Sequence, residues 1–209
     1  MGALLMRLDT VTPGGLAWVD LDRPRGKPLA LVAIGHGAGG GVEAPDLLAV
    51  RDAAVAAQFA VARITQPYRV LGRRAPAPSA RLDEAWLSAI AELRRQRGLR
   101  ALPLVALGRS SGARVACRTA AAAGAVAVVA LAFPVHPPGN PEKSRLDELA
   151  LPAVPVLVVQ GDRDAFGMPP SGVAQVVVIP GADHGLKKDV AAIASAVVAF
   201  VAAVVAVGG

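Results

Sequence analysis

The chain has 209 residues, of which 54% are hydrophobic and 3% aromatic, and its formal net charge is +6. This apolar content excludes a disordered chain, and the length suits one domain, residues 1–209, with a core made mostly of Ala, Val and Leu. The positive charge is scattered apart from one arginine cluster within 94–100, which a solvated helix end explains, so we expect no nucleic-acid partner.

Short apolar runs alternate with longer helical patterns along the chain. Residues 4–10 and 16–22 predict an antiparallel pair of strands. Six further runs have the continuous apolar character of strands buried on both faces of a parallel sheet: 29–37, 59–67, 102–110, 125–134, 155–162 and 174–181. Helices are predicted over 45–58, 80–97, 111–123, 142–149 and 187–206.

This alternation predicts an α/β fold, with a mostly parallel sheet of about seven or eight strands and helices on both faces. Such sheets bind ligands beyond the carboxyl ends of their strands, where the loops converge. The residues that directly follow each strand are therefore the first candidates for a functional site.

The single cysteine, Cys117, excludes an internal disulfide and a cysteine-rich metal site, and its place in a helical apolar pattern favours the core. The first ten residues lack the features of a signal peptide, so we expect a cytoplasmic protein. Residues 190–207 are uncharged and approach the length of a membrane-spanning helix. Because alanine drives insertion weakly, we expect a helix packed on the sheet and no membrane association. The alternative is an apolar C-terminal membrane anchor.

A doubled serine follows the predicted strand 102–110, in the sequence GRSSG. The pattern G-x-S-x-G forms a sharp strand-to-helix turn that holds a nucleophilic serine clear of an α/β sheet. Side chains two residues before and after the serine would collide with neighbouring elements, so glycine is needed at both positions. Centring the pattern on Ser111 would put Arg109 and Ala113 there, so Ser110 is the predicted nucleophile.

A serine hydroxyl needs a base that is itself oriented by a carboxylate. His184 follows the last predicted strand, and Asp162 and Asp164 follow the strand before it. We favour Asp164, because Asp162 is expected at the edge of its strand, facing Arg163 or solvent. The resulting order of Ser, Asp and His is that of α/β-hydrolases and differs from chymotrypsin and subtilisin.

A glycine-rich sequence, GHGAGGG at 35–41, follows the first strand of the predicted parallel sheet. It matches neither GxGxxG nor GxxxxGK[ST], and alone it fits a plain turn. Beside a catalytic serine it can supply one of two backbone N–H donors to the oxyanion of acyl transfer. We expect these donors to be Ser111, at a helix start, and Ala38, with Gly37 as the alternative. His36 is then structural and not a second base.

Together these motifs resemble the dienelactone-hydrolase-like branch of the α/β-hydrolase superfamily, which includes small bacterial proteins and a domain in a eukaryotic chromatin-complex subunit. The resemblance rests on six segments: HGAGGG (36–41), PYRVLGRRAPAP (67–78), LGRSSGARVA (107–116), FPVHPPGNPEK (133–143), VVQGDRDAFG (158–167) and GADHGLKK (181–188). It implies an α/β-hydrolase fold with Ser110, Asp164 and His184 in the triad positions.

The chain departs from the pattern of this branch in several places. Ser111 is small where relatives carry a bulky residue after the nucleophile, and Ala113 replaces a second glycine. Dienelactone hydrolases proper use a cysteine nucleophile, so the serine speaks against lactonase activity and leaves ester chemistry intact. The segment 164–173 is short and rich in Pro and Gly, which favours a loop over the usual helix.

The site is expected to be shallow and open, with minimal or no lid, because residues 135–153 are too few for the lid of larger α/β-hydrolases. His136 and the loop 68–74 would border it. Three arginines of this loop are candidates for binding an anionic group of the substrate: Arg69, Arg73 and Arg74. The alternative is that they pair with nearby acidic residues and stiffen the loop. Arg109 is expected to form a buried structural ion pair.

These residues predict a serine hydrolase for a small or surface-presented ester or thioester, without a metal or organic cofactor. Ser110 would attack the carbonyl, His184 would act as base and then as acid, and Asp164 would orient the imidazole. The alternatives are a non-catalytic interaction module that keeps the fold and an acyltransferase with the same triad. A scaffold has no need of all three side chains, which favours the enzyme.

Overall fold

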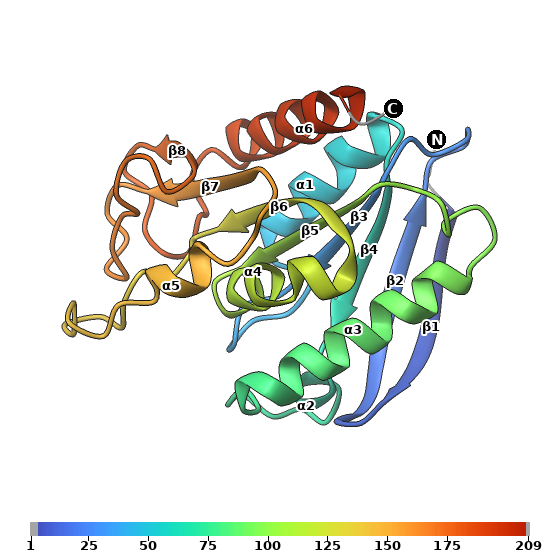
Figure 1. Cartoon of the computed structure of the whole chain (residues 1–209), viewed down its shortest axis with the longest axis horizontal. Coiled ribbons are helices and arrows are strands. Elements are labelled where there is room, and N and C mark those ends of the chain that lie inside the picture. The colour runs from blue at the N-terminus through green and yellow to red at the C-terminus, as the bar shows by residue number, and fades with distance from the viewer. Residues whose placement is uncertain (1–3, 208–209) are drawn as a thin grey trace.

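The computed structural model describes residues 4–207, which form an eight-stranded sheet with helices on both faces (Figure 1). The strands are β1 (Leu4–Thr12), β2 (Gly15–Arg23), β3 (Leu31–Gly35), β4 (Ala60–Thr65), β5 (Leu104–Arg109), β6 (Ala125–Leu131), β7 (Val156–Gly161) and β8 (Gln175–Ile179). The helices are α1 (Pro45–Ala56), α2 (Pro67–Val70), α3 (Ser79–Arg95), α4 (Ser111–Ala123), α5 (Leu146–Leu149) and α6 (Val190–Val207).

The strand order is β1-β2-β4-β3-β5-β6-β7-β8. As predicted, β1 and β2 pair antiparallel, and β2 also runs antiparallel to β4, whereas the strands from β4 to β8 are parallel. The parallel strands therefore end at one edge of the sheet, where the loops after β3, β4, β5, β7 and β8 come together. The predicted fold class is confirmed.

Proline and glycine residues mark the ends of several helices. Proline occupies the first turn of α1 and of α2, where the missing N–H costs no hydrogen bond. Gly124 ends α4 in the left-handed conformation. Two helices begin later than predicted: the one expected from 142 begins at Leu146, and the one expected from 187 begins at Val190. The four-residue α2 was not predicted.

The core has two parts, one on each face of the sheet. Helices α3 and α4 cover one face, where Trp86 and Phe133 are the largest buried side chains. Helices α1 and α6 cover the other face, where the buried side chains are mostly aliphatic and include Phe59. Cys117 is buried in α4 as predicted, and burial raises the pKa of its thiol to about 12.

Helix α6 packs against α1, burying Ile193, Ala194, Val197 and Val201, as expected for a helix laid on the fold. It is also the one helix within residues 4–207 that is long and apolar enough to cross a membrane, and only 22% of it is buried. Six of its eight exposed residues are alanine, and none of the eight is charged.

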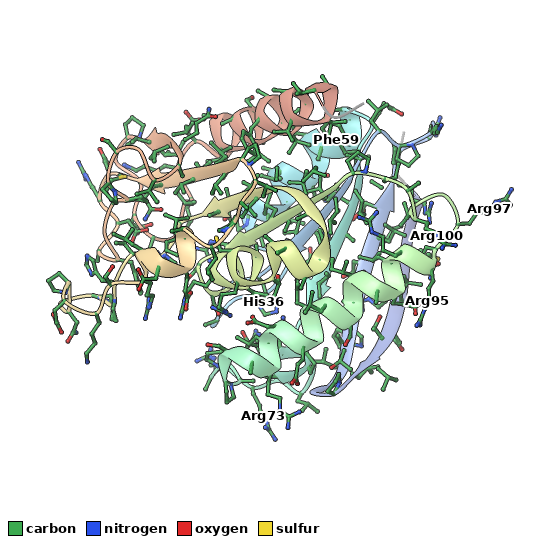
Figure 2. The ribbon with its side chains drawn as sticks, in the orientation of Figure 1. His36, Phe59, Arg73, Arg95, Arg97 and Arg100 are labelled. Carbon is green, nitrogen blue, oxygen red and sulfur yellow. The ribbon has the colours of Figure 1, made fainter. Side chains whose placement is uncertain are left out.

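The arginine cluster lies at the carboxyl end of α3, away from the loops that follow the parallel strands (Figure 2). Arg94 caps the following turn by donating to the carbonyl oxygens of Leu99, Arg100 and Leu102. The side chains of Arg95, Arg97 and Arg100 are exposed. This arrangement is the solvated helix end that the sequence indicated.

Candidate active site

Ser110 stands in a strained turn between β5 and α4. Its φ of 52° and ψ of −112° lie outside the regions that ordinary residues favour. The backbone N–H of Ser110 donates to the carbonyl oxygen of Leu131, 2.9 Å away on the neighbouring strand β6. The turn therefore holds the hydroxyl at the carboxyl edge of the sheet, as in a nucleophile elbow.

The two glycines that frame Ser110 have no room for side chains. A Cβ on Gly108 would overlap the backbone of Gly112, and a Cβ on Gly112 would lie 2.6 Å from the carbonyl oxygen of Gly35. These contacts are the steric reason for the two glycines of the motif, and they fit a motif centred on Ser110 rather than Ser111.

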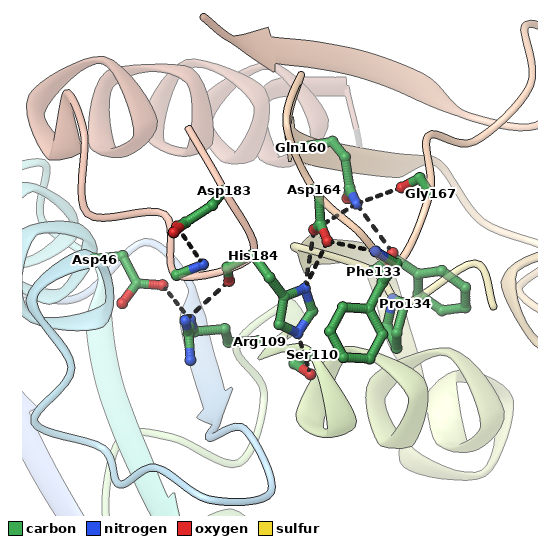
Figure 3. Close-up of polar contacts among 12 residues, drawn as sticks. Asp46, Arg109, Ser110, Phe133, Pro134, Gln160, Asp164, Gly167, Asp183 and His184 are labelled. Atoms are coloured by element: carbon green, nitrogen blue, oxygen red, sulfur yellow. Dashed lines mark hydrogen bonds and ion pairs between the residues drawn. The ribbon is translucent and has the colours of Figure 1, made fainter. Parts of the chain in front are cut away.

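Ser110, His184 and Asp164 form a continuous hydrogen-bonded chain (Figure 3). The Oγ of Ser110 lies 2.8 Å from Nε2 of His184, and Nδ1 of His184 lies 2.9 Å from Oδ2 of Asp164. With the hydroxyl donating to Nε2, the imidazole carries its proton on Nδ1 and donates it to the carboxylate. The side chain of Asp164 is fully buried, and that of His184 is 24% exposed. The structure thus brings together the three residues predicted from their order in the sequence.

Two further donors hold the Asp164 carboxylate, and neither was predicted. The N–H of Phe166 donates to Oδ1 at 2.9 Å, and the amide of Gln160 donates to Oδ2 at 2.9 Å. Gln160 is fully buried, and its Nε2 also lies 2.8 Å from the carbonyl oxygen of Gly167 and 3.2 Å from that of Phe133. Three acceptors around one nitrogen fix the orientation of the amide. The available signal was a lone polar residue inside the apolar run of β7.

The ring of Phe166 stacks on the imidazole of His184, with centroids 3.9 Å apart and planes inclined by 27°. The aromatic face of one ring thereby limits rotation of the other. Sequence reasoning used the segment QGDRDAFG only for its aspartates and missed this contact.

His36 links the loop after β3 to the loop after β4. The backbone N–H of Gln66 donates to Nε2 of His36 at 3.1 Å, so the ring proton resides on Nδ1, which donates to the carbonyl oxygen of Gly37 at 2.8 Å. Burial, aided by the charge of Arg69, lowers the pKa of His36 and keeps the ring neutral. These two hydrogen bonds agree with the structural role predicted for His36.

The carbonyl of Gly37 and the N–H of Ala38 belong to one planar trans peptide and point in opposite directions. By fixing the carbonyl, His36 therefore also fixes the direction of the Ala38 N–H. The next carbonyl, that of Ala38, accepts a 2.8 Å hydrogen bond from the hydroxyl of Tyr68. A Cβ on Gly37 would lie 3.6 Å from Cβ of Ser110, so this loop lies directly against the serine.

Arg109 forms the structural ion pair that the sequence indicated, and its partner is Asp46 in the first turn of α1. Nε of Arg109 lies 3.0 Å from Oδ2 of Asp46, whose side chain is 1% exposed, and Nη2 donates to the carbonyl oxygen of His184 at 3.0 Å. Burial raises the pKa of Asp46, and the charge of Arg109 opposes this rise. One guanidinium therefore ties the elbow, α1 and the histidine loop together.

His136 and the arginines of the loop 68–74, which were predicted to border the site, contact different parts of the structure. His136 packs on the loop that carries Asp164, where a Cβ on Gly167 would lie 2.6 Å from Nε2 of His136. Arg69 donates to the carbonyl oxygen of Arg73 at 3.0 Å. Within residues 4–207, neither these two arginines nor Arg74 forms an ion pair with an acidic side chain, so the expected alternative of stiffening pairs is not observed.

The connection from β6 to β7 carries only the short helix α5, and no lid domain is inserted there. The segment 164–173 is a loop, as expected. Across the described part of the chain, no group of three His, Cys, Asp or Glu side chains is placed to hold a metal ion.

The mostly parallel sheet, the strained serine turn and the Ser-His-Asp contacts at its carboxyl edge define the class of α/β-hydrolases. The chain belongs to the α/β-hydrolase domain family, whose pattern it matches over residues 28–204. No curated protein matches the sequence.

Several solved structures share the fold at low identity. A lidless α/β serine hydrolase from Xanthomonas campestris is 20% identical, with a TM-score of 0.73 over 94% of this chain and 93% of that one. Est1E from Butyrivibrio proteoclasticus is 18% identical, with a TM-score of 0.78 over 96% and 99%. A dienelactone hydrolase from Anabaena variabilis is 18% identical, with a TM-score of 0.75 over 96% and 97%. The predicted membership of the α/β-hydrolase superfamily is confirmed.

Proposed function

We propose that the chain is a serine hydrolase that cleaves carboxylic esters or thioesters through an acyl-enzyme intermediate. The observation that carries the proposal is the unbroken chain from Ser110 Oγ through the imidazole of His184 to the buried carboxylate of Asp164. Serine nucleophiles are activated by a base that a third group orients, and these contacts meet that requirement.

In the proposed reaction, Nε2 of His184 takes the proton of Ser110 as Oγ attacks the substrate carbonyl. The N–H groups of Ser111 and Ala38 receive the negative charge on the carbonyl oxygen, and the amino-terminal end of α4 adds its dipole. The imidazolium then protonates the leaving oxygen or sulfur, and the acyl group stays on Ser110. Water, deprotonated by His184, attacks the ester and releases the carboxylic acid.

The proposed substrates are small or surface-presented esters, because the connection after β6 inserts no lid that would enclose a long acyl chain. Within residues 4–207, no acidic side chain neutralises the charges of Arg69 and Arg74, which supports a preference for anionic substrates. Arg73, the third arginine predicted to bind substrate, lines a separate cavity. Because the reacting residues come from the protein alone, the proposal needs no metal or organic cofactor. A cytoplasmic location stays a prediction.

The test is covalent labelling with a fluorophosphonate, together with turnover of short p-nitrophenyl esters and thioesters. Wild-type protein should be labelled and active, and Ser110→Ala should be neither. Ser111→Ala is the matched control, because it removes the neighbouring hydroxyl and keeps the backbone N–H that the mechanism uses. Equal labelling of wild type and Ser110→Ala would overturn the assignment of the nucleophile. A labelled protein that turns over no ester of any chain length would overturn the proposed hydrolysis.

A further inference from the structure

A cavity of about 240 Å³ lies between the β1–β2 turn, α2 and the first turn of α3. None of its lining residues belongs to the Ser110–His184–Asp164 chain or to the loop 35–41. Its volume is slightly below the range of drug-sized ligand pockets, which suits a small organic molecule. The cavity is therefore a site separate from the one at which acyl transfer is proposed.

The cavity shares a wall with the active site. Gln66, Tyr68 and Leu82 line it on one side and, on the other, line a much smaller space beside His36 and Ser111. The same wall holds the loop 35–41 in place, because the N–H of Gln66 bonds to His36 and the hydroxyl of Tyr68 bonds to the Ala38 carbonyl. A change in the position of this wall therefore reaches the peptide that presents the Ala38 N–H.

The wall is incompletely bonded. The side chain of Gln66 is 6% exposed, and its Nε2 donates to the carbonyl oxygen of Leu82 at 3.1 Å. Its Oε1 is buried without a hydrogen-bond partner among residues 4–207. This unmade hydrogen bond costs free energy, so the wall around Gln66 is less stabilised than a fully bonded one. Gln66 also lines the cavity, so a ligand bound there contacts the residue whose backbone N–H holds His36.

The lining indicates the ligand chemistry. Pro13, Pro67 and Leu71 give the cavity apolar walls, whereas Arg73 and Arg81 provide two positive charges. Arg73 has no acidic partner within the described residues, and it projects from the loop after α2 (Figure 2). Nη1 of Arg81 lies 3.5 Å from Glu84, and both side chains are at least half exposed, so this surface pair contributes little. Two arginines beside an apolar surface fit a carboxylate on a small apolar body.

We propose that this cavity binds a small organic carboxylate, and that binding raises turnover by holding Gln66 and Tyr68 in the positions that fix the loop 35–41. The binding step is independent of catalysis, whereas the effect on turnover rests on the proposed hydrolase activity. The carboxylate acts here as an effector and undergoes no reaction.

Binding is tested by titrating ¹⁵N-labelled protein with sodium benzoate at constant ionic strength. The backbone amide signals of Gly14 and Leu71 should shift and saturate, with a Kd on the order of 1 mM for so small a ligand. Benzamide has the same shape without the charge and should bind at least about tenfold more weakly. Equal affinity for the two compounds, or no saturation, would overturn the proposal.

Variants on α3 locate the charge that binds. Arg81→Gln should weaken benzoate binding about tenfold, which corresponds to losing one charge-assisted contact. Arg95→Gln is the matched control, because Arg95 is an exposed arginine at the opposite end of the same helix. Equal losses in both variants would indicate a nonspecific charge effect and contradict the assigned site. Ser110→Ala should bind as wild type does, and loss of binding there would place benzoate at the active site.

The effect on turnover is measured with a neutral p-nitrophenyl ester. Saturating benzoate should raise the kcat of the wild type about twofold or more, and Arg81→Gln should need about ten times more benzoate for the same relative increase. Benzoate that binds in the cavity without changing kcat would overturn the coupling. If no ester is hydrolysed while benzoate still binds as described, the proposed function fails and the binding site stands. If esters are hydrolysed but benzoate does not bind, the proposed function stands and the binding site fails.

Discussion

At the residue scale, Asp164 illustrates how the site is prepared before any substrate arrives. Its carboxylate is fully buried and accepts bonds from the imidazole of His184, the N–H of Phe166 and the amide of Gln160. Three donors compensate for removing the charge from water, because charge-assisted hydrogen bonds are about twice as strong as neutral ones. Gln160 is thus a positioning residue, acting on His184 through Asp164.

We expect Gln160→Met to lower kcat about tenfold with little change in KM, since a hydrogen bond to a charged group contributes about 1.5–3 kcal/mol and substrate binding does not involve Gln160. Steady-state kinetics with a short ester measures both parameters. Gln96→Met removes a partly buried amide distant from the site and should leave both unchanged. A rise in KM at constant kcat in Gln160→Met would contradict the positioning role.

His36 makes stability depend on pH. Its folded-state pKa lies below the value of about 6.5 in the unfolded chain, so the unfolded state binds the proton more readily. The contribution of neutral His36 is therefore complete above about pH 6.5 and is lost as the pH falls toward the folded pKa, by up to about 1.4 kcal/mol per pH unit.

We predict that the free energy of unfolding of the wild type exceeds that of His36→Gln most strongly near neutral pH. Urea denaturation at about pH 7 and about pH 5 should show the difference between the two proteins shrinking in acid. Glutamine is chosen because it offers a neutral amide of similar reach. A difference independent of pH would mean that the pKa of His36 is the same in the folded and the unfolded state.

At the scale of elements, the junction of β5 with α4 depends on close backbone contact. Gly108 meets the backbone of Gly112, and Gly112 meets the end of β3, so one helix start is pressed against two strands. The glycine at the end of α4, Gly124, has a positive φ of 63° and open space around its Cα. Substitution of Gly108 therefore tests steric overlap, whereas substitution of Gly124 tests backbone strain.

Gly108→Ala should destabilise the protein by well over about 3 kcal/mol or prevent folding, because a backbone contact cannot yield as a flexible side chain can. Gly124→Ala should cost about 1–2 kcal/mol, the usual penalty for a residue with a side chain in the left-handed region. Urea unfolding of both variants measures the contrast. Equal losses would show that the close contact at Gly108 relaxes cheaply.

The elements that sequence reasoning located well are those with strong local signals. The eight strands were predicted from apolar runs, and Ser110 was distinguished from Ser111 by steric demand at Gly108 and Gly112. Gln160, Phe166 and Asp46 were missed because their roles arise from contacts between segments far apart in the chain. The carbonyl of Gly167 or the ring of His184 becomes a partner only after β7 and β8 lie side by side. Periodicity carries no information about such pairings.

At the scale of the whole molecule, α6 closes the second face of the core while presenting an uncharged alanine surface. Val197 is 1% exposed and packs in the cluster beneath α1, whereas Ala203 is exposed on the same helix. Substitution of Val197 therefore tests packing within the fold, whereas substitution of Ala203 tests contact with a membrane or another molecule.

We expect Val197→Asp to lower the free energy of unfolding by about 3 kcal/mol or more and Ala203→Asp to change it by no more than about 0.5 kcal/mol. Urea denaturation measures both values. The wild type should remain in the supernatant when lipid vesicles are sedimented. Co-sedimentation that Ala203→Asp abolishes, with no effect of Val197→Asp on unfolding, would favour a membrane anchor.

The hydroxyl contact between Tyr68 and the Ala38 carbonyl has a practical consequence. Tyr68 is the only tyrosine in the chain, and burial raises the pKa of its phenol to about 12, above the ordinary value of 10.0. The ultraviolet absorbance of tyrosinate in alkali therefore reports on the burial of this one side chain without overlap from other phenols. A ligand or substitution that loosens the loop beside Ser110 and exposes Tyr68 should lower the pKa of its phenol. The change is measured as a shift in the alkaline titration of ultraviolet absorbance.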